Sequence, residues 1–191
     1  MPGRRGEGLG SILFNAALEH AGDRVVGLDG VVEQQPYYAR MGFELLHRNM
    51  RWLGTGTGVR SDDVVDLTEA PHAYDEAIFG ATRAAWLDGW IEPPHRAVTI
   101  PGRGYGVSRP NELGRKIGPL YADDAETAKR LLDALVDAGE RFVIDVPAAN
   151  PAAASLTDGL EPVFETARME RGGRSRTDWD RTFGIGTLEL G

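Results

Sequence analysis

Hydrophobic residues recur with helical spacing near the start of the chain. They follow the i, i+3, i+4, i+7, i+8 pattern of one face of an amphipathic helix, at Leu9, Ile12, Leu13, Ala16 and Ala17. Gly22 stands where a helix C-terminal glycine is expected. The pattern therefore predicts an amphipathic helix that ends just before Gly22.

Three shorter patterns follow this helix. The run VVGLD (25–29) predicts a buried strand, and Pro36 favours the start of a short helix that ends near Gly42. From Leu45 to Trp52 two sets of side chains alternate, which predicts a long strand.

The rest of the chain predicts two more helical regions and several strands. Tyr74, Ile78, Ala81 and Ala85 share one face of a helical stretch. A second helix follows the N-cap candidates ADD (122–124), and its apolar stripe is Ala128, Leu131, Leu132, Leu135 and Val136, ended by Gly139. NPAAASL (150–156) suggests a short helix, and strands are predicted at AVTI (97–100), GYGVS (104–108), KIGPLY (116–121), FVIDV (142–146), PVFETARM (162–169) and FGIGTLEL (183–190). The order of elements is that of a mixed α/β fold.

The two parts of the chain resemble each other. Between them, GTGTGVRSDD (54–63) is rich in glycine and lacks apolar periodicity, which is typical of a linker. Each part has a helix, a short apolar strand, a proline-containing turn, a short helix and a long strand. Aligning Gly42 with Gly159 also pairs Arg51 with Arg168. We interpret this as an internal duplication.

Composition excludes several classes of function. The formal net charge is −8, so no basic surface suited to nucleic acid is expected. No apolar run approaches the roughly 20 residues that span a membrane, and no signal-peptide pattern opens the chain, so we expect a cytoplasmic protein without a membrane partner. The chain has no cysteine, which excludes disulfides, thiolate metal sites and an acyl-cysteine intermediate. Its four histidines show no metal-ligand spacing, so no metal is expected.

The loop Arg5-Gly6-Glu7-Gly8-Leu9-Gly10 precedes the first helix. Its glycines let the backbone approach a ligand, and the N–H groups of a first helical turn can hold a phosphate. A flexible tail that leads into a helix is the alternative interpretation. No lysine precedes Lys116, which excludes a Walker motif, and no strand precedes the glycines as a dinucleotide fold requires.

Together with the following helix, strand and Tyr38-Ala39-Arg40-Met41-Gly42-Phe43, this loop makes residues 3–54 resemble the GCN5-related N-acetyltransferase superfamily. Later segments resemble the second domain of a tandem-domain bacterial subgroup of that superfamily. They are GYGVSRP (104–110), KIGPLYADD (116–124), DVPAANPAA (145–153), EPVFETARM (161–169) and FGIGTLELG (183–191).

The resemblance implies an α/β fold with an acyl-coenzyme A N-acyltransferase-like mixed sheet and flanking helices. It implies a partial first domain in residues 1–54, a linker in 55–68, and a second domain of the same type, without the pyrophosphate loop, in 69–191. The strands that normally precede the loop are absent from the chain, so an unpaired sheet edge and a homo-oligomer are expected. The residues implied to bind the pyrophosphate of acetyl-coenzyme A are Arg5, Gly6, Glu7, Gly8, Leu9, Gly10 and Ser11.

The resemblance also implies a catalytic role for Tyr38, as the acid that protonates the departing coenzyme A thiolate; a packing aromatic is the alternative. The aligned position in the second part is Ser155, a poorer acid. No general base is identified, and Asp29 and Glu33 are interpreted as exposed carboxylates. The expected activity is acetyl transfer by direct attack of an amine of a small molecule or peptide. The alternative function is a non-catalytic binding or assembly module.

Two further groups of residues remain open to interpretation. Trp86, Trp90, His95 and the Pro93-Pro94 pair either line an acceptor pocket or, as we prefer, form a helix end packed on the core. The arginines of the last loop are interpreted as solvated, because acidic residues dilute them; they are Arg168, Arg171, Arg174 and Arg176.

Overall fold

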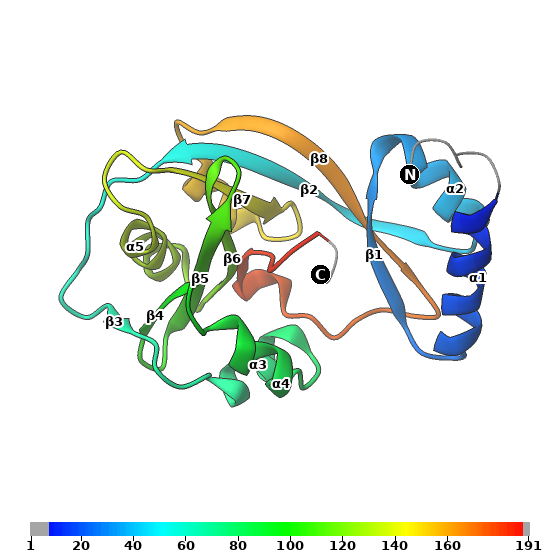
Figure 1. The fold of residues 1–191 in the computed structure, drawn as a ribbon, viewed down its shortest axis with the longest axis horizontal. Coiled ribbons are helices and arrows are strands. Elements are labelled where there is room, and N and C mark those ends of the chain that lie inside the picture. The colour runs from blue at the N-terminus through cyan, green and yellow to red at the C-terminus, as the bar shows by residue number, and fades with distance from the viewer. Residues whose placement is uncertain (1–7, 189–191) are drawn as a thin grey trace.

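A computed structural model describes residues 8–188. Its strands form one sheet in the order β1-β8-β2-β7-β6-β5-β4-β3, with β9 paired to β6 (Figure 1). The strands are β1 (Val26–Val31), β2 (Glu44–Thr55), β3 (Val65–Asp66), β4 (Arg96–Ile100), β5 (Gly104–Asn111), β6 (Gly114–Ala122), β7 (Arg141–Pro147), β8 (Glu161–Arg171) and β9 (Thr182–Gly184). The helices are α1 (Leu9–Ala21), α2 (Gln35–Arg40), α3 (His72–Phe79), α4 (Ala84–Trp90) and α5 (Ala125–Leu135), with 3-10 turns η2 (Val32–Gln34), η3 (Pro151–Thr157) and η4 (Trp179–Arg181).

The expected α/β class with a mixed sheet is confirmed. β6 and β7 are parallel, and the other described pairs are antiparallel. The sheet is continuous across both parts of the chain, because β2 lies between β7 and β8 while β1 lies at one end beside β8. The division into 1–54, 55–68 and 69–191 stays a prediction.

The β2–β8 pair relates the two parts of the chain by an approximate two-fold axis. Under the alignment of Gly42 with Gly159, Asn49 corresponds to Thr166, and these two residues are direct partners in the antiparallel ladder. The long strands β2 and β8 cross the molecule from the end that carries α5 to the end that carries α1 and α2 (Figure 1). This register supports an internal duplication.

The same symmetry relates the outer neighbours of β2 and β8. Arg51 on β2 lies opposite Asp145 on β7, and its counterpart Arg168 on β8 lies opposite Asp29 on β1. Asp29 and Asp145 are therefore the equivalent carboxylates of the two parts.

Three hydrophobic clusters stabilise the fold. The first joins α5 and η3 to β4, β6 and β7, and the second lies beneath α3 and α4. The third packs α1 and α2 against β1 and β8 through Phe43, Ala167 and Met169 with Phe14, Leu18, Tyr38 and Met41. The stripe predicted for α5 is buried, as expected.

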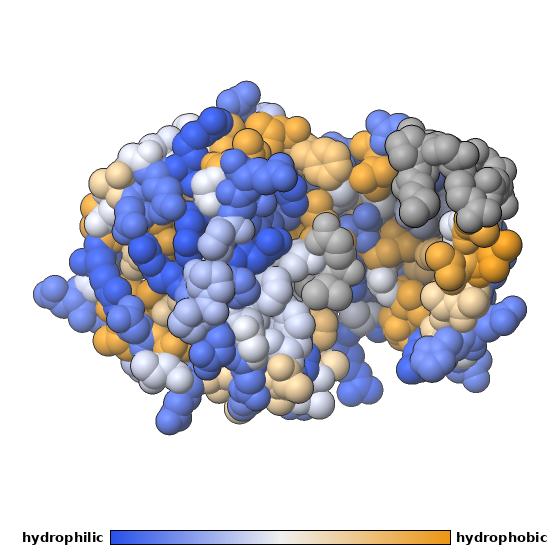
Figure 2. Space-filling view, in the orientation of Figure 1, coloured by the Kyte–Doolittle hydropathy of each residue, from blue (hydrophilic) through white to orange (hydrophobic). Residues whose placement is uncertain are grey.

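The apolar stripe predicted on α1 does not pack against the sheet. Leu9, Ile12 and Leu13 are 45%, 63% and 72% exposed, and α1 packs instead through Phe14 and Leu18. Hydrophobic surface is correspondingly visible at the end of the molecule that carries α1 (Figure 2).

Three other details differ from the sequence prediction. The helical stretch of the second part is two helices, because Gly80 adopts a left-handed conformation (φ 85°) and ends α3. The run VVGLD contributes to a strand at the end of the sheet, where its residues as wholes are half-buried or exposed although the Asp29 side chain is covered, so the prediction of a buried strand was wrong. The last predicted strand is confined to β9 within the described residues.

None of the helices in residues 8–188 is long and apolar enough to cross a membrane.

Candidate active site

A cavity of about 430 Å³ lies at the start of α1. It brings together two residues of the predicted glycine loop, Gly10 and Ser11, and the predicted acid Tyr38. Its other lining residues are Phe14, Gln34 and Tyr37. Arg5, Gly6 and Glu7, which complete the predicted pyrophosphate loop, lie outside the described residues.

The backbone donors in the first turn of α1 have no acceptor within the helix. Gly8 precedes the helix in a left-handed conformation (φ 73°), and its carbonyl accepts the first helical hydrogen bond, from Ile12 N at 3.0 Å. The N–H groups of Leu9, Gly10 and Ser11 therefore have no partner within the helix. No described side chain caps this end, and its first turn holds no acidic residue.

The corresponding helix of the second part begins differently. Asp124 caps α5 by accepting a hydrogen bond from Thr127 N at 2.8 Å, and Glu126 lies in the first turn. A carboxylate thus already occupies the positive end of this helix dipole. The start of α5 is unsuited to a phosphate.

Tyr38 is held in place by aromatic packing. Its ring lies 5.7 Å from Phe14 and 6.2 Å from Phe43, between ring centres, and it covers Gly30 of β1. The aligned Ser155 donates a hydrogen bond to the Ala152 carbonyl at 2.8 Å, within η3. The catalytic role of Tyr38 stays a prediction.

On the opposite face of β1, Asp29 is not the exposed carboxylate that the sequence suggested. Its side chain is 1% exposed, Asn49 Nδ2 donates to its Oδ1, and Arg168 Nη1 lies 3.6 Å from its Oδ2. Burial raises the pKa of Asp29 to about 6, against the opposing effects of Arg168 and Asn49. Glu33 is exposed, as expected.

The equivalent carboxylate, Asp145, is held by two close cations. Arg51 binds it through two hydrogen bonds of 2.7 and 2.9 Å, and Lys116 Nζ lies 2.8 Å from its Oδ2. Burial alone would raise the pKa of Asp145, but Lys116 and Arg51 hold it below its usual value. Burial lowers the pKa of Lys116 to about 8.

Polar side chains therefore form a strip across one face of β1, β8, β2, β7 and β6. We call this the polar strip, and it includes Asp29, Asn49, Arg51, Lys116, Asp145 and Arg168. Arg168 belongs to this strip, so its interpretation as part of a solvated loop was wrong: it lies on β8 beside Asp29 and Glu170. Within residues 8–188, three buried atoms of the strip have no hydrogen-bond partner, namely His47 Nε2, Asn49 Oδ1 and Thr166 Oγ1. Burial also lowers the pKa of His47. The alternation of polar residues along β2 is the sequence signal that could have revealed the polar strip.

The chain itself fills the space where β6 and β7 diverge. These strands pair only over Arg115–Ile117 and Phe142–Ile144, and β9 joins β6 beyond that point. Just after β9, Ile185 N donates to the Asp145 carbonyl at 3.1 Å. Among the described residues, β7 is therefore flanked beyond its pairing with β6 by the segment that follows β9.

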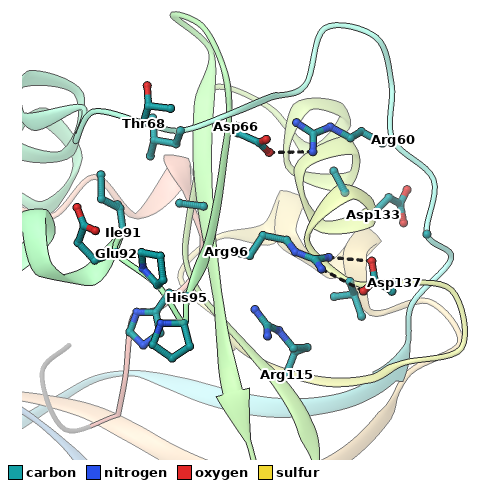
Figure 3. Close-up of a pocket in the computed structure, with 17 residues that line it drawn as sticks. Arg60, Asp66, Thr68, Ile91, Glu92, His95, Arg96, Arg115, Asp133 and Asp137 are labelled. Atoms are coloured by element: carbon teal, nitrogen blue, oxygen red, sulfur yellow. Dashed lines mark hydrogen bonds and ion pairs between the residues drawn. The ribbon is translucent and has the colours of Figure 1, made fainter.

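A larger cavity, of about 830 Å³, lies at the far end of the sheet, next to β3 and β4 (Figure 3). Pro93, Pro94 and His95 contribute to its lining, whereas Trp86 and Trp90 stack on each other 4.6 Å apart and pack on the core. The residues predicted as an aromatic acceptor pocket therefore do not line one cavity. The two tryptophans pack on the core, which is the interpretation that we preferred.

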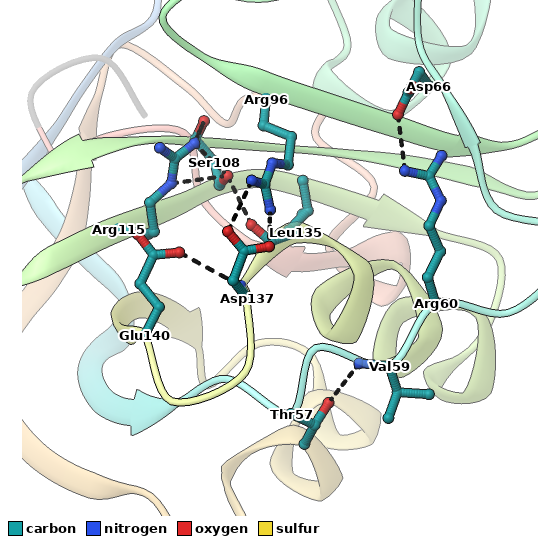
Figure 4. Close-up of polar contacts among 10 residues, drawn as sticks. All are labelled: Thr57, Val59, Arg60, Asp66, Arg96, Ser108, Arg115, Leu135, Asp137 and Glu140. Atoms are coloured by element: carbon teal, nitrogen blue, oxygen red, sulfur yellow. Dashed lines mark hydrogen bonds and ion pairs between the residues drawn. The ribbon is translucent and has the colours of Figure 1, made fainter.

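Most of the charged side chains around this larger cavity form ion pairs or hydrogen bonds with other residues of the chain. Arg60 pairs with Asp66 at 2.9 Å, and Arg96 binds Asp137 at 2.9 and 3.0 Å (Figure 3). Arg115 binds the Ser108 carbonyl and hydroxyl, and burial lowers its pKa (Figure 4). This cavity lies at the opposite end of the sheet from Tyr38, and none of the predicted site residues lines it, so the cavity at α1 is the one that the sequence prediction favours. Residues 8–188 hold no group of histidines and carboxylates able to bind a metal ion.

Comparisons with known proteins identify the family of the chain. Residues 72–184 match the model of the acetyltransferase (GNAT) domain family. Holothin acyltransferase from Pseudoalteromonas sp. (strain SANK 73390) is 32% identical over 208 aligned positions, which cover 100% of this chain and 70% of that protein.

Solved structures share the fold. A putative acetyltransferase from Pyrococcus horikoshii superposes with a TM-score of 0.86 at 24% identity, covering 100% of this chain and 69% of that one. A GCN5-related N-acetyltransferase from Kribbella flavida gives a TM-score of 0.56 at 20% identity, covering 89% of this chain and 50% of that one. On the domain match and the 32% identity together, the chain belongs to the GNAT family of acyltransferases.

Proposed function

We propose that this chain transfers an acetyl group from acetyl-coenzyme A to the amino group of a small molecule. The observation that carries the proposal is the cavity at α1, where Gly10 and Ser11 lie beside Tyr38. A helix start attracts phosphate, and a phenol can protonate a thiolate. The cavity therefore combines the two functions that this transfer needs.

The start of α1 suits a diphosphate in shape and charge. Gly8 supplies a left-handed turn, and an ideal Cβ on Gly10 would have no neighbour within 4 Å, so a ligand can approach the backbone closely. The N–H groups of Leu9, Gly10 and Ser11, which no described side chain caps, lie at the positive end of the helix dipole. Arg5, Gly6 and Glu7 are proposed to extend this site.

The chain's own chemistry is a proton transfer from Tyr38. When bound, acetyl-coenzyme A supplies a thioester whose acetyl group passes to the amine. Tyr38 donates its Oη proton to the departing sulfur, while the rings of Phe14 and Phe43 hold the phenol in position. Because the chain contains no cysteine, the amine attacks the thioester directly rather than through an acyl-cysteine.

The proposed acceptor class follows from a relative. The name of holothin acyltransferase describes acylation of holothin, and that protein aligns with all of this chain. An amine of a small molecule is therefore the first acceptor to test, ahead of a peptide.

A non-catalytic binding or assembly module is the second candidate function. The exposed residues Leu9, Ile12 and Leu13 favour it, because hydrophobic stripes of this kind often meet a partner. Thiol release separates the two functions. The chain is mixed with acetyl-coenzyme A and either tyramine or 1,4-diaminobutane. Release of the coenzyme A thiol that requires the amine supports the enzyme. Binding of acetyl-coenzyme A without thiol release, whichever amine is added, supports the module.

A further inference from the structure

The larger cavity beside β4 lies apart from the proposed active site. Its volume of about 830 Å³ is within the range that small-molecule sites occupy in proteins. Its walls come from the segment after β2, the loop before β4, the starts of β4 and β6, and the end of α5. Because Tyr38 lines the cavity at the other end of the sheet, a ligand bound beside β4 would be separate from the proposed transfer reaction.

Three arginines line this cavity, and two of them are paired with carboxylates. Arg60 contacts Asp66 at 2.9 Å, and Arg96 binds Asp137 through two hydrogen bonds (Figure 3). Arg115 contacts only neutral oxygens among the residues that the structure describes. Arg115 is therefore the arginine of this cavity whose charge is not neutralised by a carboxylate in contact with it.

The Arg115 side chain is held in position by a buried serine. Its Nη2 donates to the Ser108 carbonyl at 2.9 Å and to the Ser108 hydroxyl at 2.8 Å (Figure 4). Ser108 is 0% exposed, and its hydroxyl donates to the Leu135 carbonyl at 3.0 Å, at the end of α5. Arg115 Nη1 has no acceptor among the described residues, so it keeps two N–H donors for a ligand. A guanidinium that is oriented in advance loses little side-chain entropy when it binds an anion.

The surroundings of Arg115 make its charge costly without a ligand. Burial lowers the pKa of Arg115, the charges of Glu140 and Asp137 raise it, and Arg96 lowers it. Glu140 makes no ion pair with Arg115; its Oε2 instead accepts from Asp137 N at 3.4 Å (Figure 4). A half-buried cation without a contacting anion costs free energy, and a bound carboxylate would recover part of it through charge-assisted hydrogen bonds.

Other charges of the lining limit the anion to a single negative charge. Glu92 and Asp133 also line the cavity, and the negative end of the α5 dipole lies beside Ser108. These charges would repel a doubly charged phosphate more strongly than a carboxylate. The cavity therefore favours a monoanion at Arg115.

The remaining lining suits an organic body. His95 Nδ1 donates to the Trp90 carbonyl at 2.7 Å, so Nε2 of the neutral ring is an acceptor. In Figure 3 the Arg115 guanidinium points toward the side of the cavity that holds His95. The apolar residues of the lining are Leu67, Ile91, Pro93, Pro94, Ala97 and Val136.

We propose that this cavity binds a small organic acid, with its single carboxylate on Arg115 and its apolar body against the loop before β4. Such a ligand joins the segment after β2 to β4 and α5. Because it binds the folded chain, it stabilises the fold by mass action.

The first test titrates phenylacetate into the full chain and follows the Nε–H resonance of Arg115 and the ring resonances of His95. Phenylacetamide is the matched ligand, since it has nearly the same shape without the charge. We expect phenylacetate to shift both sets of signals and to saturate at millimolar concentration. Phenylacetamide and inorganic phosphate should bind at least about 10-fold more weakly. Equal affinity for the acid and the amide, tighter binding of phosphate, or no saturable shift with either phenylacetate or 4-methylpentanoate overturns the proposal.

The second test compares Arg115→Gln with Arg60→Gln, a matched loss of one guanidinium from the same cavity. We expect the affinity for phenylacetate to fall at least about 10-fold in the Arg115 variant and to stay within about 2-fold in the Arg60 variant. Arg115→Lys keeps the charge and should lose less affinity than Arg115→Gln. Unchanged affinity in Arg115→Gln, or an equal loss in both glutamine variants, contradicts the site. If Arg115→Gln does not fold, the comparison of phenylacetate with phenylacetamide in the wild-type chain decides.

Discussion

Asn49 on β2 lies directly opposite Thr166 on β8, and the two residues occupy the same position in the two parts of the chain. Both are buried, and both have one side-chain oxygen that finds no hydrogen-bond partner among the described residues. The approximate two-fold axis passes between them. Asp29 and Tyr38 therefore have equivalents in the same molecule, Asp145 and Ser155, which provide matched controls for their substitutions.

The equivalent carboxylates should respond to the same substitution with opposite signs. At pH 7.5 Asp29 is ionised at a cost, because its pKa in the folded chain is about 6 rather than 3.8. Asp29→Asn should therefore stabilise the fold, by at most about 3 kcal/mol. Asp145→Asn should destabilise it by about 3–5 kcal/mol, because Lys116 and Arg51 lose their buried partner. Urea unfolding of the two variants measures both.

The pH dependence gives an independent check on Asp29. Between about pH 4 and 6 the folded chain holds the Asp29 proton more tightly than the unfolded chain, so this group lowers stability as pH rises through that window. The stabilisation by Asp29→Asn should shrink toward zero at pH 4. An equal gain at pH 4 and pH 7.5 would show that ionisation of Asp29 is not its cause.

Tyr38→Phe should lower turnover on the order of 100-fold or more while acetyl-coenzyme A affinity stays nearly unchanged, because only the hydroxyl proton is lost. The equivalent change, Ser155→Ala, should affect neither, since the Ser155 hydroxyl serves a local backbone carbonyl. Steady-state kinetics and calorimetry on the same samples measure both quantities. If Tyr38→Phe leaves turnover unchanged while Ser155→Ala abolishes it, the active site lies in the other part of the chain.

Asp124→Ala should cost about 1 kcal/mol of stability, because α5 loses the side chain that accepts from Thr127 N. Acetyl-coenzyme A affinity should not change, since the proposed diphosphate site is at α1. Thermal unfolding and a binding titration test the two statements separately. A large change in affinity with little change in stability would place the ligand at α5.

Local patterns in the sequence predicted most elements. The helix ending at Gly22, the alternating strand after Leu45 and the stripe of α5 all follow from spacing between near neighbours. Which face of α1 packs was not predictable in this way. Phe14 and Leu18 are selected by contact with Tyr38 and Met169, residues brought in by distant strands.

The polar strip was missed for the same reason. Asp29, Arg51, Asp145 and Arg168 are far apart in the chain, and only the pairing of β1 with β8 and of β2 with β7 places them together. From the sequence alone, an isolated carboxylate near the end of a strand is predicted to be exposed. Strand order decides that Asp29 is buried. By contrast, the resemblance of a local stretch of sequence predicts Gly10, Ser11 and Tyr38 as site residues, and in the structure all three line one cavity; their roles stay a prediction.

Calorimetric titration of acetyl-coenzyme A into two variants of Gly10 tests the central claim most directly. A Cβ at this position meets no described atom within 4 Å, so neither Gly10→Glu nor Gly10→Lys should disturb the fold, and the two differ mainly in charge. The account predicts that the wild-type chain binds, that glutamate at the helix start weakens binding at least 10-fold through repulsion of the diphosphate, and that lysine preserves it. Equal affinity in both variants would contradict a diphosphate site at the start of α1.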